Sequence, residues 1–213
     1  MLACDPILVQ RNDGSGGFAR NWNDYKAGFG DRSTPKGAYW LGNEFLHILT
    51  KTGRYKLHFD LLSKNGIWYW AEYSKFSVDN EDTQYTVHIS EHSGTAGDAT
   101  IAGDSGGTDG MKFSTYDRDN TKRCAAYVNG GFWYDRCSYI FVNTPVLAKQ
   151  WRMVWLVSNN PSLNIELAFS RMYLMCFWPK LRFTIKSQAW TFTIKPLWQW
   201  MIDQCQLAVN LSA

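Results

Sequence analysis

Three stretches of the chain have apolar residues at the spacing of helices. In the first, aromatic residues recur every three or four positions, which predicts a helix near residues 18–28 with its apolar stripe toward the core. Those aromatic residues are Phe18, Trp22, Tyr25 and Phe29. A second helix is expected near 43–51, with Asn43 as its N-cap. The pattern at residues 166–177 also favours a helix.

Alternation of apolar and polar residues predicts an antiparallel sheet. The predicted strands occupy residues 7–9, 54–62, 68–78 and 85–89, with weaker alternation at 183–195. The turn Lys64-Asn65-Gly66 has hairpin chemistry and joins the two longest strands. Residues 93–110 are rich in small and polar side chains without an apolar period, so we expect a loop there.

Composition bounds the class of protein. The chain has 213 residues, 45% hydrophobic and 19% charged, which fits one globular domain or one domain with an appendage. The net charge of +3 is too small to argue for a nucleic-acid or membrane partner. Residues 145–213 hold two acidic residues against seven basic ones, and six of the eleven tryptophans, so we place a boundary near residue 145.

The stretch Phe113–Cys137 concentrates the candidate chemistry. Asp117 and Asp119 alternate in a polar loop, where they could surround a calcium ion or form a turn without metal. Cys124 and Cys137 can close the following loop, and an aromatic run lies between them. The chain has five cysteines, an odd number that leaves at least one thiol unpaired or paired with another chain. The sequence shows no nucleophile elbow, and no metal-binding histidine pair or pair of catalytic carboxylates at the spacing that such sites have.

Six ordered blocks resemble the C-terminal fibrinogen-like domain of fibrinogen, ficolins, tachylectins, angiopoietins and tenascins. The blocks are ILVQRNDGS at 7–15, FARNWNDYKAGFG at 18–30, WLGNE at 40–44, AEYSKFSV at 71–78, SGTAGD at 93–98 and the stretch 113–137. The resemblance covers about residues 4–143. It weakens after Cys137, beyond which only Asn143 still matches the family pattern.

The resemblance implies an α+β fold with a twisted antiparallel sheet, two helices and a loop-rich calcium- and ligand-binding region. It assigns residues 1–144 to the domain and leaves 145–213 as a divergent tail, either a genuine extension or a gene-model artefact. Within the domain, 1–14 is the remnant of a truncated first subdomain, 15–115 the central sheet and 116–144 the binding region.

The resemblance also implies a calcium site. Asp117 and Asp119 would supply carboxylates, and Thr121 and Arg123 would supply backbone carbonyls. The chain departs from the family here, because Thr121 replaces an acidic residue and the spacer before the first cysteine is shorter. Lys122 and Arg123 add positive charge that repels a cation, so we expect a weakened site.

A disulfide and a ligand pocket complete the implied site. The family pairs the cysteines that correspond to Cys124 and Cys137, and its lectin members have a cis peptide before the second, here Arg136–Cys137. The implied ligand-binding residues are Tyr127, Trp133, Arg136, Cys137 and Ser138. The family's pocket tyrosine falls on Val128, with Tyr127 one place early, so the pocket walls depart from the lectin pattern.

The leading functional expectation is a secreted, non-enzymatic module that binds acetylated glycans or pathogen-surface carbohydrates with calcium support, as in innate immunity. The alternative is a protein-binding module, either a receptor ligand like angiopoietins or a matrix component like tenascins. An enzyme is the third and least favoured class. No signal peptide is visible, and no stretch approaches the roughly 20 apolar residues of a membrane span. Oligomers would form only through segments that this sequence lacks.

Overall fold

A computed structural model of the chain describes residues 5–53, 55–101, 107–121, 123–137, 139–144 and 152–176. The strands are β1 (Ile7–Asn12), β2 (Tyr39–Trp40), β3 (Tyr55–Ser63), β4 (Trp68–Val78), β5 (Val87–Gly94), β6 (Phe113–Ser114), β7 (Phe132–Trp133), β8 (Val154–Trp155) and β9 (Ile165–Cys176). The helices are α1 (Trp22–Ala27), α2 (Asn43–Thr50) and α3 (Cys124–Val128), with short 3-10 helices η1 (Glu81–Thr83) and η2 (Pro161–Leu163). The weak strands expected at 183–195 lie outside the described residues.

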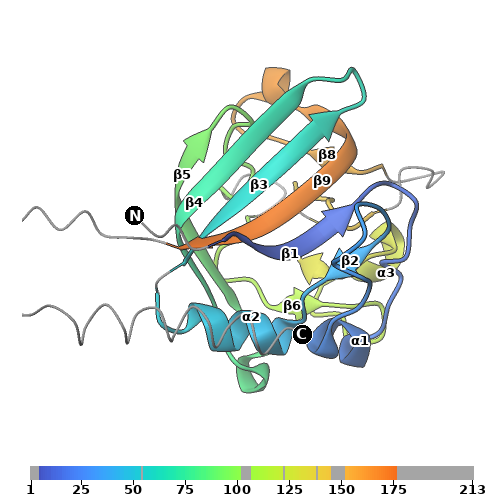
Figure 1. Cartoon of the computed structure of the whole chain (residues 1–213), viewed down its shortest axis with the longest axis vertical. Coiled ribbons are helices and arrows are strands. Elements are labelled where there is room, and N and C mark those ends of the chain that lie inside the picture. The colour runs from blue at the N-terminus through green and yellow to red at the C-terminus, as the bar shows by residue number, and fades with distance from the viewer. Residues whose placement is uncertain are drawn as a thin grey trace, which may run out of the picture. The chain divides into compact units, whose positions relative to one another are not determined.

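A seven-stranded sheet forms the centre of the fold, and all its described pairings are antiparallel. The strand order is β2-β1-β9-β3-β4-β5, with β8 paired to the start of β9. Figure 1 shows β9 running between β1 and β3. The α+β fold with an antiparallel sheet is confirmed, and β4 matches the predicted strand 68–78 residue for residue.

Two expectations for the second half of the chain are wrong. The helix expected at 166–177 is the strand β9, and the boundary expected near residue 145 does not end the sheet, because β8 and β9 lie beyond it. The alternation in β9 is interrupted by one residue. Ile165 and Leu167 are buried in the first run, and Ser170, Met172 and Leu174 in the second, with a register shift against β3 between them. A bulge therefore hides the period of two.

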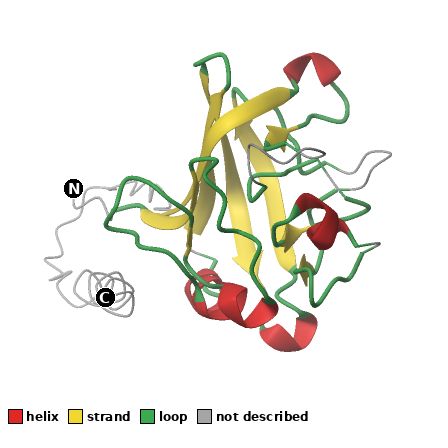
Figure 2. Ribbon diagram, turned by 90° about the vertical axis from the view of Figure 1, so that its right-hand side faces the viewer, coloured by secondary structure: helices red, strands yellow, loops and turns green. Residues whose placement is uncertain are grey.

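The predicted helices form as α1 and α2, both shorter than expected, and they lie below the sheet in Figures 1 and 2. Asn21 starts α1 because its side chain accepts a hydrogen bond from Asp24 N at 2.9 Å. Gly28 ends α1 with a positive φ of 91°, and a Cβ there would lie 2.5 Å from the Leu41 carbonyl oxygen.

The expectation that Asn43 caps the second helix is wrong. The N-cap is Gly42, and Asn43 is already helical. The Asn43 side chain instead accepts a hydrogen bond from Trp40 Nε1 at 3.0 Å. Burial beside Trp40 thus decides the role of this side chain, and the local capping preference does not.

An aromatic cluster joins α1, the sheet and the segment that precedes the disulfide. The Tyr25 ring lies 5.5 Å from Trp40 and 5.2 Å from Phe113, and the Phe113 ring lies 5.1 Å from Trp133. All four side chains are almost fully buried. Because this cluster is rigid and dense, it fixes the position of the loops that follow Phe113 and Trp133.

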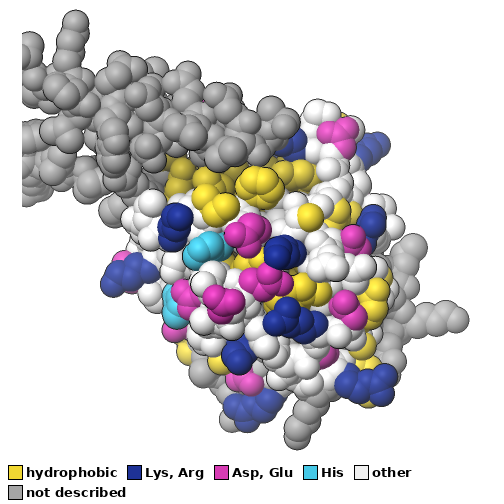
Figure 3. Space-filling model, turned by 90° about the horizontal axis from the view of Figure 1, so that it is seen from below, with side chains coloured by type: hydrophobic (Ala, Val, Ile, Leu, Met, Phe, Trp, Pro, Cys, Tyr) yellow, Lys and Arg dark blue, Asp and Glu magenta, His cyan; other side chains and the backbone are white. Residues whose placement is uncertain are grey.

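One face of the molecule shows no bias toward one charge. On the face drawn in Figure 3, the described acidic and basic side chains are interspersed. This agrees with the small net charge of +3. Among the described residues, no helix is long and apolar enough to span a membrane.

Candidate functional site

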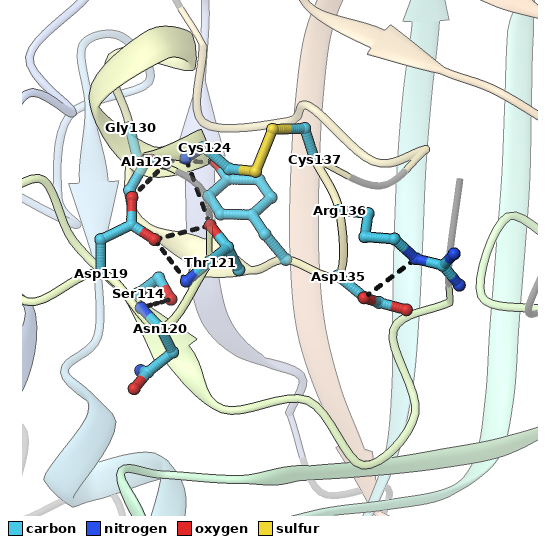
Figure 4. Close-up of a disulfide and its surroundings, with 11 residues drawn as sticks. Ser114, Asp119, Asn120, Thr121, Cys124, Ala125, Gly130, Asp135, Arg136 and Cys137 are labelled. Atoms are coloured by element: carbon cyan, nitrogen blue, oxygen red, sulfur yellow. Dashed lines mark hydrogen bonds and ion pairs between the residues drawn. A yellow bond between two sulfur atoms is a disulfide. The ribbon is translucent and has the colours of Figure 1, made fainter. Parts of the chain in front are cut away.

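The predicted disulfide between Cys124 and Cys137 is confirmed, with the two Cα atoms 5.0 Å apart. Cys124 is fully buried and begins α3, whereas Cys137 lies in an irregular segment after β7. Figure 4 shows the bond beside the loop that carries Asp119 and Thr121. The disulfide therefore ties the region around the second cysteine to the first residue of α3. Cys176 is also disulfide-bonded.

The turn between the cysteines is locked to the core by two buried side chains. Tyr25 donates its hydroxyl hydrogen to the Phe18 carbonyl and accepts from Gly131 N, each at 2.8 Å. Burial raises the pKa of Tyr25 far above its ordinary value, so the hydroxyl keeps its proton. Asn143 donates to the Gly131 carbonyl at 2.7 Å. A Cβ on Gly130 would lie 2.2 Å from the Asn143 carbonyl oxygen, so only glycine fits there.

Asp119 acts as a hydrogen-bond acceptor for the start of α3. Its Oδ1 accepts from Thr121 N at 2.8 Å and from Thr121 Oγ1 at 2.6 Å, and its Oδ2 accepts from Ala125 N at 3.1 Å. Thr121 Oγ1 in turn accepts from Cys124 N at 3.2 Å. Figure 4 shows Asp119 and Thr121 next to Cys124 of the disulfide. The carboxylate thus satisfies backbone donors that a helix start leaves unpaired.

Asp117 faces a different helix. Its Oδ1 accepts from Thr115 Oγ1 at 2.7 Å and from Trp22 N, the first residue of α1, at 3.1 Å. Between the two acids, Arg118 places its guanidinium carbon 4.0 Å from the centre of the Trp22 ring and pairs with Glu81 at 3.6 Å. The sequence gives one signal for this contact, an arginine between two acidic residues, but it does not indicate the aromatic partner.

The donor set does not fit the calcium site that the resemblance implies. Calcium needs six to eight oxygen ligands. Here both carboxylates accept hydrogen bonds from the protein, and the Thr121 and Arg123 carbonyls accept from Arg123 N at 2.8 Å and Tyr127 N at 3.0 Å. Within the described residues, no group of three or more His, Cys, Asp or Glu side chains could hold a metal ion. Calcium binding by this loop stays a prediction.

The implied ligand pocket is brought together only in part. Trp133 is 1% exposed and donates its ring N–H to the Tyr85 carbonyl at 2.7 Å, so it is a core residue and does not line a pocket. The expected cis bond at Arg136–Cys137 is wrong, since no described peptide bond is cis. Both residues instead have positive φ, 45° and 65°, which turns the chain sharply before the disulfide. Ser138 lies outside the described residues.

A small basic and aromatic surface is what the site exposes. Tyr127 is 55% exposed and Arg136 has a side chain 66% exposed. Arg123 is also exposed, and its guanidinium carbon lies 5.9 Å from the centre of the Tyr127 ring. Arg123 and Arg136 each directly precede a cysteine of the disulfide, so the bond holds the backbone at these two arginines close together. We call Arg123, Tyr127 and Arg136 the arginine–tyrosine surface. The sequence analysis names Arg123 only for its backbone carbonyl and does not predict a binding role for its side chain. The position of Arg123 directly before Cys124 could have indicated that role.

Comparisons with known proteins agree with this fold. The family model described as fibrinogen beta and gamma chains, C-terminal globular domain, matches residues 5–166. Fibrinogen-like protein 1 of Bos taurus is 41% identical over 140 residues, 62% of this chain and 45% of the relative. Angiopoietin-1 of Bos taurus is 39% identical over 134 residues, 62% of this chain and 26% of the relative. The chain thus spans less than half the length of each of these two relatives.

Among solved structures, a lamprey fibrin D-dimer complexed with the peptide ligand Gly-His-Arg-Pro-amide has a TM-score of 0.72 at 27% identity. The match covers 88% of this chain and 66% of that one. The match to the family model, over residues 5–166, extends past residue 143, where the resemblance seen in the sequence ends. The matched residues, the shared fold and the disulfide together show that this chain belongs to the fibrinogen C-terminal domain family.

Proposed function

We propose that this chain is a secreted, non-enzymatic recognition module whose ligand is a protein, in preference to an acetylated glycan. One observation carries the proposal. Trp133, one of the ligand-binding residues that the resemblance implies, is buried, and the exposed side chains at the disulfide are arginine and tyrosine. These residue types are enriched among the side chains that dominate protein–protein binding energy.

The charge of the surface defines the class of partner. Arg123 and Arg136 each precede a cysteine of the disulfide, and Asp135 neutralises only part of their charge through an ion pair of 3.7 Å with Arg136. A guanidinium binds a carboxylate through two parallel hydrogen bonds. A protein segment rich in Asp or Glu, with an apolar residue to cover Tyr127, would complement this surface.

Two further observations support the proposal. The relatives include an angiopoietin and a fibrinogen-like protein, and the lamprey fibrin structure holds a peptide ligand. Disulfides persist in oxidising compartments, so the bonded Cys124, Cys137 and Cys176 favour an extracellular location. The calcium-supported glycan module remains the second candidate. It rests on the resemblance of the 113–137 stretch to lectin members of the family.

The test is binding of the purified chain to a panel of purified cell-surface and matrix ectodomains, measured by interferometry. For any ectodomain that binds, Tyr127→Ala and Arg136→Ala should each weaken binding by about tenfold or more. Raising the salt concentration should weaken binding further, because the surface is charged. Ile67→Ala is the matched control, since Ile67 is a 52% exposed apolar residue on the β3–β4 hairpin. Equal binding by all variants would show that another surface is used.

A further inference from the structure

We infer that the loop from Thr115 to Ala125 is held in place by the protein's own contacts and needs no divalent cation. The inference concerns how the loop is stabilised and does not rest on the proposed function. The loop is the one in which the resemblance expects calcium. The geometry assigns each of its acidic side chains to a different task.

Asp119 and Thr121 together satisfy the start of α3. The two oxygens of Asp119 accept three hydrogen bonds, between 2.6 and 3.1 Å, from Thr121 and Ala125. Thr121 Oγ1 accepts a fourth from Cys124 N. The threonine that replaces the family's acidic residue thus becomes a donor to Asp119. A calcium ion in this place would have to displace those donors.

The Asp117 carboxylate has different partners, on α1 and at Thr115. It binds Trp22 N and the Thr115 hydroxyl, so one carboxylate connects the loop to the first turn of α1. Asn120 fixes the loop to β6, because its Nδ2 donates to the Phe113 carbonyl at 2.8 Å and its N–H donates to Ser114 Oγ at 3.1 Å. Asp117, Asp119 and Asn120 therefore attach the same short loop to α1, α3 and β6.

Arg118 places a positive charge of the protein itself within the loop that carries Asp117 and Asp119. Its guanidinium lies over the Trp22 ring at 4.0 Å and pairs with Glu81, which also accepts from Trp22 Nε1 at 2.7 Å and from Lys26 Nζ at 2.5 Å. A cation over an indole ring is attracted to its face. A dication bound between Asp117 and Asp119 would be repelled by this neighbouring guanidinium.

The test compares melting temperatures in 10 mM calcium and in EDTA by differential scanning calorimetry. A site with a Kd of about 0.1 mM would raise the melting temperature by about 5–10 °C in about 10 mM calcium. We expect the unchanged protein to melt at the same temperature in both buffers. Asp119→Asn should lower the melting temperature by the same amount in both, because it removes an acceptor that serves α3. Asp82→Asn, which changes an exposed acid of η1, is the control and should melt like the unchanged protein.

Two outcomes would overturn the inference. One is a rise in the melting temperature with calcium that Asp119→Asn abolishes. The other is heat released when calcium is titrated into the unchanged protein and lost in Asp119→Asn, which can be measured even if the variant is less stable. Arg118→Gln adds an independent arm, since the inference expects it to lower the melting temperature in EDTA. No change there would count against the role given to Arg118.

Discussion

Replacing Tyr25 with phenylalanine isolates the contribution of one hydroxyl group to the loop region. The ring contacts with Trp40 and Phe113 remain, so the aromatic cluster keeps its packing. What is lost is the hydrogen bond to the Phe18 carbonyl and the one from Gly131 N, both 2.8 Å long and both to buried groups. The substitution therefore leaves the buried Gly131 N–H unpaired, whereas the Phe18 carbonyl still accepts a hydrogen bond from Arg20 N at 2.8 Å.

An unpaired buried group costs about 1–3 kcal/mol, so the substitution should lower the free energy of unfolding by about 2 kcal/mol. For a domain of this size, that corresponds to a melting temperature lower by about 4–8 °C. Urea unfolding followed by tryptophan fluorescence measures the free energy directly. Tyr127→Phe is the matched control, because the Tyr127 hydroxyl is exposed and makes no hydrogen bond within the described residues.

The reasoning fails if Tyr25→Phe unfolds within about 0.5 kcal/mol of the unchanged protein with the same denaturant slope, a difference typical of neutral surface changes. That result would mean that the loop relaxes to pair the Gly131 N–H in another way. The Gly130-Gly131 turn would then not be fixed to α1.

Three further predictions follow from the same contacts. Gly130→Ala should destabilise the fold by more than Gly66→Ala, which paired denaturation curves can measure. A Cβ at Gly130 would lie 2.2 Å from a carbonyl oxygen, whereas a Cβ at Gly66, at a positive φ of 80°, would point into open space. Glu81→Gln should flatten the acid side of the stability profile. Its hydrogen bonds with Lys26 and then Trp22 hold the pKa of Glu81 below its ordinary value, so its contribution is full at neutral pH and is lost as the pH falls through that lowered pKa. Replacing Cys124 and Cys137 with serine should cost about 3 kcal/mol of unfolding free energy, and an undiminished value in non-reducing buffer would contradict it.

Local patterns in the sequence predict the first half of the sheet well. The predicted strand at 54–62 corresponds to β3, which alternates without interruption, and its apolar residues such as Phe59 and Leu61 are the buried ones. The same pattern does not predict β9 as a strand, because the alternation of its buried residues shifts by one position near Phe169. A change of phase in a strand of this kind resembles the spacing of a helix.

The candidate site is predicted less well, because its pattern is ambiguous in physical terms. Alternate acids in a polar loop suit a calcium ion and suit the backbone donors of helix starts equally. The choice depends on where α1 lies relative to Asp117, which is ninety-five residues from Trp22 in the chain. The disulfide is predicted from the family resemblance and confirmed, whereas the burial of Trp133 depends on contacts with Trp40 and Phe113 that no local pattern contains.

A recognition surface of arginine and tyrosine that works without calcium is the central claim. The most direct measurement applies the same labelled protein to an ectodomain panel and to an array of acetylated glycans, each in calcium and in EDTA. We predict binding to one or more acidic ectodomains that EDTA leaves unchanged and that Arg136→Ala weakens, with no signal on the acetylated glycans. Binding to acetylated glycans that calcium supports and EDTA abolishes would contradict the account.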